Sequence, residues 1–181
     1  MAAVNDFEFS GSWLVSIDVK GRMVFPNEFR DGLKSQCKKK VVLTQHFSEP
    51  CLQLSSDTYW FQQMEEFKKE VAASNKAINE ARESRQINEE QRLRRSRKNL
   101  EWKARIIYGS HLCDIDRMGR VLIPKDLRTL ANLVEKVRVI AIKSKFEIWD
   151  QQVYANRFQR FQDNAQEDAD FPSMLDQFSF D

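Results

Sequence analysis

The sequence predicts an α+β protein in which two related β-hairpin and short-helix units form one core with pseudo-two-fold symmetry. The main observation is an internal repeat: residues 18–30 (DVKGRMVFPNEFR) return as residues 116–128 (DRMGRVLIPKDLR). Asp, Gly, Arg, Pro and Arg recur at the same places, with apolar residues at matching positions between them. Because the apolar spacing recurs together with the charges, both copies are predicted to fold alike. Apolar residues at helical spacing between and after the copies predict additional helices.

In the first copy, two short strands are predicted at Trp13–Ile17 and Arg22–Phe25. They are expected to form a hairpin across Asp18–Gly21, where Gly21 can adopt a positive φ. Pro26 then suits the first position of a helix, where a missing N–H costs nothing. We therefore expect a short helix after the hairpin in each copy.

A second pair of strands is predicted in each copy. In the first copy it joins Val41–Thr44 with Cys51–Leu54, and in the second it joins Val137–Ile142 with Phe146–Trp149. These runs are short and apolar, as expected for buried strands.

The stretch between the copies begins with an amphipathic helix behind two cap candidates, Ser56 and Asp57. Its apolar residues recur at helical spacing: Trp60, Met64, Phe67 and Val71. Residues 75–98 then contain eight basic residues and four Glu but almost no apolar face. They predict either a solvated helix or a mobile linker. Helical spacing resumes with Leu93, Leu100, Ala104 and Ile107.

After the second copy, Tyr154, Phe158 and Phe161 predict a closing helix, and disorder is expected from Asn164 onward. The predicted organisation is an N-terminal extension (1–11), a first unit (12–59), a helical, charged connecting segment (60–109), a second unit (110–153), a closing helix (154–163) and an acidic disordered tail (164–181).

Length and charge limit the classes of protein. With 181 residues, of which 41% are hydrophobic, the chain can bury one moderate core or two small ones. The net charge is +2, but residues from Asp163 onward are acidic and contain no Lys or Arg, so the body is basic and suits an anionic partner such as nucleic acid. No apolar run approaches the roughly 18 residues that span a bilayer, and Asp6 and Glu8 do not fit a signal peptide. We expect a cytoplasmic protein without a membrane partner.

The sequence does not favour an enzyme. His46 with Cys51, and His111 with Cys113, lack the spacing of zinc ligands. With Cys37 the cysteines are odd in number, which favours reduced thiols in the core over disulfides. Glycine-rich phosphate loops and catalytic triads are also missing from the sequence. We expect no catalytic residues, no cofactor, no metal and no small-molecule substrate.

Several ordered motifs resemble the MraZ family of bacterial transcriptional regulators. The D-x-x-x-R signature that marks each of the family's two units occurs here as Asp18–Arg22 and Asp116–Arg120. Phe9–Gly11 and Lys145–Asp150 are similar to the family's N-terminal and C-terminal signatures. The chain departs from the family in its leader and in its longer connecting segment.

This resemblance implies a fold and a function. The fold would be two AbrB-like (SpoVT-AbrB) units in one double-split βαβ core. The function would be that of a transcriptional regulator that binds double-stranded DNA sequence-specifically in the nucleoid. It would repress the division and cell-wall gene cluster, its own gene included. It would bind repeated short promoter sites as a homo-oligomeric ring.

The candidate DNA-contacting residues lie in the two signatures. An Arg on a β-ribbon can bind guanine bidentately or hold a phosphate, but Arg22 could instead pair with Asp18 or with an Asp of the other unit. The residues alone leave both interpretations open, and the resemblance favours DNA contact. Lys20 suits a phosphate contact and Met118 does not, so the first unit is expected to dominate. The candidate set is Asp18, Lys20, Arg22, Asp116, Arg117 and Arg120.

Other basic residues are assigned differently. Arg30 and Arg128 are expected in helix-end ion pairs or subunit contacts. Lys38–Lys40 are expected in a loop, and Arg92–Lys98 are expected on a solvated face. For both stretches the alternative is a contact with DNA.

Two other functions stay open at this point. One is an AbrB-type, antitoxin-like regulator that binds a protein partner. The other is a structural ring module without specific DNA binding.

Overall fold

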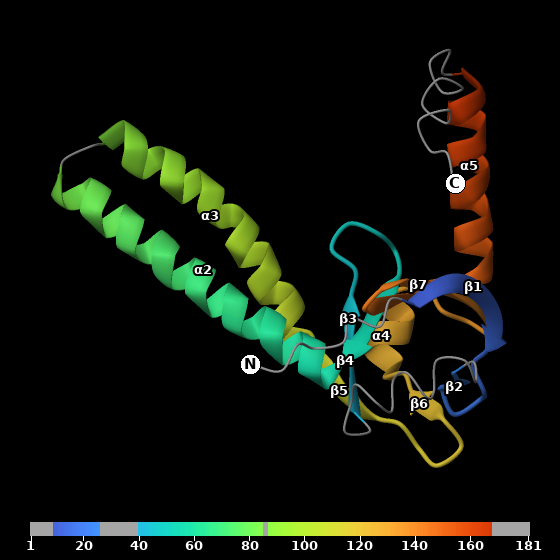
Figure 1. The fold of residues 1–181 in the computed structure, drawn as a ribbon. Coiled ribbons are helices and arrows are strands. Elements are labelled where there is room, and N and C mark those ends of the chain that lie inside the picture. The colour runs from blue at the N-terminus through green and yellow to red at the C-terminus, as the bar shows by residue number, and fades with distance from the viewer. Residues whose placement is uncertain (1–8, 26–39, 85–86, 168–181) are drawn as a thin grey trace, which may run out of the picture.

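The computed structural model describes residues 9–25, 40–84 and 87–167. A body of β-strands carries helices that project from it in two directions (Figure 1). The strands are β1 (Phe9–Ser16), β2 (Arg22–Val24), β3 (Lys40–Gln45), β4 (Leu52–Ser56), β5 (His111–Asp114), β6 (Arg120–Leu122), β7 (Lys136–Lys143) and β8 (Lys145–Asp150). The helices are α2 (Asp57–Glu83), α3 (Ile87–Tyr108), α4 (Lys125–Leu130) and α5 (Gln151–Glu167).

The main sheet has six antiparallel strands in the order β1-β7-β8-β4-β3-β5. Each repeat supplies one hairpin, β3–β4 or β7–β8, and the two hairpins meet at the centre of the sheet through β4 and β8. The first strand of each repeat joins the hairpin of the other, because β1 pairs with β7 and β5 pairs with β3. The predicted α+β class and the second strand pair of each repeat are therefore confirmed.

A separate two-stranded sheet joins β2 to β6, with Met23 opposite Val121. The predicted pairing of Trp13–Ile17 with Arg22–Phe25 is wrong for most of its length. Between those two segments the described structure has one bridge, Ile17 to Met23. The chain pairs across the repeats because each repeat then covers the apolar side chains of the other.

One buried cluster connects the two sheets. Phe25, which follows β2, meets Phe146 of β8 edge to face, with ring centroids 5.4 Å apart. Leu127 of α4 and the β2–β6 residues Met23 and Val121 belong to the same cluster. The protein therefore has one core built from both repeats.

The predicted helices are confirmed where the structure describes them, with one difference at the C-terminal end. The helix α4 follows the second repeat motif as predicted, whereas its counterpart after Pro26 lies outside the described residues. The closing helix α5 continues to Glu167, so disorder from Asn164 is wrong for residues 164–167, where Ala, Gln and Glu favour a helix. The tail from 168 onward is also outside the described residues.

The connecting segment forms two long helices, α2 and α3, which lie side by side and are called the arm below (Figure 1). Ser56 is the N-cap of α2, and its hydroxyl accepts a hydrogen bond from the Tyr59 N–H at 3.1 Å. Of the two alternatives for residues 75–98, the helix is correct. Ile78 and Ala81 are buried, so this stretch has a small apolar face that its charges obscured.

In the described parts of the chain, none of the helices has an apolar stretch of the length that a membrane span requires.

We predict that the distal arm can be removed without loss of the β-body. Ion pairs Glu70–Lys103 (2.7 Å) and Arg82–Glu90 (3.5 Å) set the helix register, so residues 76 and 97 face each other. Replacing residues 77–96 by a short Gly-Ser linker should lower helical circular dichroism. The melting temperature of the body should stay unchanged, because the described core cluster contains no arm residue. Aggregation or loss of the cooperative transition would show instead that the arm supports the body.

Candidate nucleic-acid interface

The turn before β2 is held by the side chain of Asp18. Its Oδ1 accepts hydrogen bonds from the backbone N–H groups of Lys20 and Arg22, both at 2.9 Å. The Gly21 N–H donates to the Asp18 carbonyl at 2.8 Å, and Gly21 has a φ of 83°, which disfavours other residues. Such a side-chain cap fixes the turn without help from the side chains at its apex.

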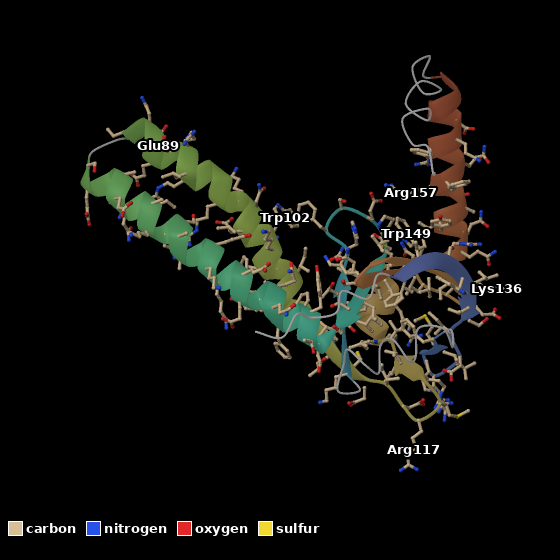
Figure 2. The ribbon with its side chains drawn as sticks, viewed as in Figure 1. Glu89, Trp102, Arg117, Lys136, Trp149 and Arg157 are labelled. Carbon is tan, nitrogen blue, oxygen red and sulfur yellow. The ribbon has the colours of Figure 1, made fainter. Side chains whose placement is uncertain are left out.

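The turn before β6 repeats this arrangement. Asp116 Oδ1 accepts from the N–H groups of Met118 and Arg120 at 2.9 Å. The Gly119 N–H donates to the Asp116 carbonyl at 2.9 Å, with φ at 73°. Arg117 lies at the tip of this turn and projects away from the body (Figure 2).

Between the turns, β2 and β6 form a ribbon with one buried and one exposed face. Met23 and Val121 face inward and are fully buried. The residues on either side of Met23 and Val121 point outward. They are Arg22, Val24, Arg120 and Leu122. Arg22 lies opposite Leu122, and Val24 lies opposite Arg120. Below, the ribbon face means these four outward residues together with the apex residues Val19, Lys20, Arg117 and Met118.

Both turns are bonded to the opposite strand, so the ribbon is longer than its three paired residues. The Phe25 N–H donates to the Gly119 carbonyl at 3.1 Å, and the Ile123 N–H donates to the Gly21 carbonyl at 2.9 Å. Each turn is therefore fixed by the other repeat.

The strand arginines, Arg22 and Arg120, are each oriented by the Asp of their own turn. Arg22 Nε donates to Asp18 Oδ2 at 2.8 Å, and Arg120 Nε donates to Asp116 Oδ2 at 2.6 Å. Arg22 was expected either to contact DNA or to pair with an Asp, and the structure shows the pair with Asp18 of its own turn. That pair does not exclude a ligand contact, because Nε is one donor of the guanidinium and its two Nη groups carry the others.

The two aspartates are ionised well below neutral pH. The pKa of Asp18 lies below its ordinary value of 3.8, mainly because the Arg22 backbone N–H donates to the carboxylate. The same cause, from the Arg120 N–H, lowers the pKa of Asp116. At neutral pH each turn therefore holds a fixed negative charge against a fixed guanidinium.

Arg128 has a role that the sequence did not predict. It was expected in a helix-end ion pair or a subunit contact, but its Nε donates to the Ile123 carbonyl at 3.2 Å. Its guanidinium also covers Gly21, where an added Cβ would lie 2.9 Å from Arg128 Cζ. Arg128 thus joins α4 to the first turn within one chain, and its counterpart Arg30 lies outside the described residues.

The remaining basic stretches are not part of the ribbon face. The Arg92–Lys98 stretch lies on the arm, which extends from the body away from β2 and β6 (Figure 1). In this stretch Arg92 pairs with Glu89 at 2.8 Å and Arg94 with Glu90 at 2.7 Å. Lys40 begins β3, whereas Lys38 and Lys39 lie outside the described residues.

The histidines that were considered as metal ligands have other partners within the described structure, and the cysteine beside each of them is a free thiol. His46 Nδ1 accepts from the Glu49 N–H at 3.0 Å, and His111 Nε2 lies 3.1 Å from Asp126 Oδ2. Cys51 and Cys113 are free thiols as predicted, and burial raises the pKa of both. A raised pKa keeps both thiols protonated at neutral pH, so neither is a reactive thiolate.

Comparison with known proteins gives one consistent result. The family model described as "MraZ protein, putative antitoxin-like" matches residues 9–84 and 106–175. A Saccharophagus degradans protein named transcriptional regulator MraZ is 31% identical over 146 residues, which cover 81% of this chain and 84% of the relative. A Burkholderia cenocepacia protein of the same name is 29% identical over 177 residues, which cover 95% and 99%. Residues 85–105, between the matched stretches, form most of α3.

We predict that the two aspartates make stability depend on acid pH. Because their pKa values are lowered by folding, their contribution is complete above pH 3.8 and is lost as the pH falls through the folded values. Asp18→Asn combined with Asp116→Asn should therefore flatten the fall in unfolding free energy between about pH 5 and pH 2. Urea denaturation at constant ionic strength measures this, and equal slopes for both proteins would contradict it.

A second prediction concerns the contact between Gly21 and Arg128. Gly21→Ala should destabilise the protein by about 1–3 kcal/mol, because alanine is strained at positive φ. Part of this loss should disappear in combination with Arg128→Ala, which removes the clash. Gly109→Ala is the matched control, since its φ is not positive and its Cβ would come no closer than 3.4 Å to another residue. Strictly additive free energies would exclude the contact.

Proposed function

This chain belongs to the MraZ family, and from that membership we propose that it is a transcriptional regulator that binds duplex DNA through the ribbon face. The observation that supports this most is the pair of arginines, Arg22 and Arg120, on one exposed face of a two-stranded ribbon. A two-stranded ribbon fits the major groove, and Arg is the residue that most often contacts guanine there.

Each candidate residue has a separate part in this proposal. Arg22 and Arg120 contact base edges. Lys20 and Arg117, which are exposed at the turn apices, neutralise backbone phosphates. Asp18 and Asp116 orient the arginines without touching DNA, because a free carboxylate would be repelled by phosphate. Arg117 gives the second turn a cation of its own, but Met118 stands where the first turn has Lys20, so we propose that the first unit contributes more.

The family resemblance implies the regulatory role, and the small size of one ribbon supports assembly. Few cations per chain give weak binding, and several chains on repeated sites raise the affinity through effective concentration. We therefore propose a homo-oligomeric ring on repeated short promoter sites, repressing the division and cell-wall genes, its own included, in the cytoplasm at the nucleoid. The exchange of β1 and β5 between repeats supports the AbrB-like double-split βαβ arrangement.

We predict that Arg22→Ala and Arg120→Ala each weaken specific DNA binding by about 5- to 150-fold, the loss of one bidentate base contact. Fluorescence anisotropy with duplex DNA from upstream of the protein's own gene measures this at one salt concentration. Arg92→Ala is the control, because Arg92 is exposed on the arm and pairs with Glu89.

Both ribbon variants should keep the wild-type circular dichroism spectrum and oligomer size. Wild-type affinity in Arg22→Ala, or equal loss in Arg92→Ala, would contradict the proposed interface.

A further inference from the structure

The two turns share a backbone frame but present their apex side chains in opposite order. In the first turn an apolar residue precedes a basic one, Val19 then Lys20. At the matching positions of the second turn a basic residue precedes an apolar one, Arg117 then Met118. The hydrogen bonds within the two turns, to the Asp side chain and along the backbone, match pairwise and agree in length to within 0.1 Å. The difference between the turns is therefore confined to side chains.

The fold does not require an apolar side chain at either apex. Asp18 and Asp116 bond the backbone N–H groups of Lys20 and Met118, which any residue except proline would supply. Val19 is 102% exposed and Met118 is 63% exposed, so neither contributes to the core. Single exposed apolar residues are common, so the surroundings of these two decide whether they have a function.

Val19 and Met118 lie at the turn apices beside a ribbon whose outward side mixes apolar and cationic side chains. On the ribbon, Val24 is 43% exposed opposite Arg120, and Leu122 is 53% exposed opposite Arg22. An interface that only neutralised phosphate would have no use for these apolar side chains. The floor of the major groove offers them one apolar feature, the C5-methyl group of thymine.

We propose that Val19 and Met118 are specificity-determining residues that contact thymine methyl groups. This inference rests on the proposed function, since it needs the ribbon face to enter the major groove. Because the apex order is inverted, the phosphate contact and the methyl contact exchange places between the two ends of the ribbon. The footprint of one chain then has a direction, although its backbone is nearly two-fold symmetric.

The experiment compares two forms of the same duplex, taken from upstream of the protein's own gene. One form contains thymine and the other contains uracil at every thymine position, which removes the methyl groups alone. Wild-type protein should bind the uracil form more weakly, by about fourfold for each methyl group that is desolvated. Val19→Ala combined with Met118→Ala should bind both forms with affinities within twofold of each other.

A charge-conserving exchange serves as the control for electrostatics. Val19→Lys combined with Lys20→Val keeps the composition and the Asp18 cap and gives the first turn the order of the second. Its melting temperature and its circular dichroism spectrum should equal those of wild type. Its preference for the thymine form should fall, because the methyl contact has moved.

The outcomes separate this inference from the proposed function. Failure of the wild type to bind either duplex would overturn both. Specific binding that is lost in Arg22→Ala but is equal for thymine and uracil duplexes would leave the proposed function standing and overturn this inference. The inference would also be overturned if the double alanine variant kept the thymine preference. The same holds if that variant changed in oligomer size but not in its preference between the two duplexes.

Discussion

The antiparallel pairing of β2 with β6 is the interaction on which the rest of the structure depends. Its inward residues, Met23 and Val121, connect the small sheet to the core, so the pairing cannot open without exposing buried apolar surface. Its outward residues include Arg22 and Arg120, which come from different repeats and meet on one face through this pairing. The glycine carbonyls of both turns accept bonds from the opposite strand, so the same interaction also fixes the two apices.

The pairing of an Asp with each ribbon Arg has two opposing effects on binding. The carboxylate reduces the positive charge of the face, which weakens long-range attraction to an anion. It also holds the Arg22 and Arg120 side chains in one orientation through bonds of 2.8 and 2.6 Å. An arginine that is already ordered loses less conformational entropy when it binds. The arrangement therefore favours discrimination between ligands over nonspecific affinity.

The sequence predicted local features well and long-range partners poorly. The β3–β4 and β7–β8 pairs were predicted correctly, because their apolar runs and the turns between them lie close together in the chain. The partner of Arg22–Phe25 was not, since an alternating pattern specifies a face but not the strand beside it. In the arm, Ile78 and Ala81 are the buried apolar residues of a highly charged stretch. Two such residues were too few for the sequence to indicate that α2 and α3 pack together. The repeat identified the candidate arginines. That Val24 and Leu122 lie opposite them on the same face became known only from the register of β2 and β6.

The exchange of first strands between the repeats has a consequence for how the chain folds. Phe9–Ser16 must wait for Lys136–Lys143, which is synthesised far later, so the main sheet has high contact order and should close slowly. The arm offsets part of this delay. As an antiparallel pair of local helices it can form early, and it brings the end of β4 near the start of β5, which shortens the effective loop that the second repeat must close. Until then β1 is an unpaired edge and a site for misassembly between nascent chains.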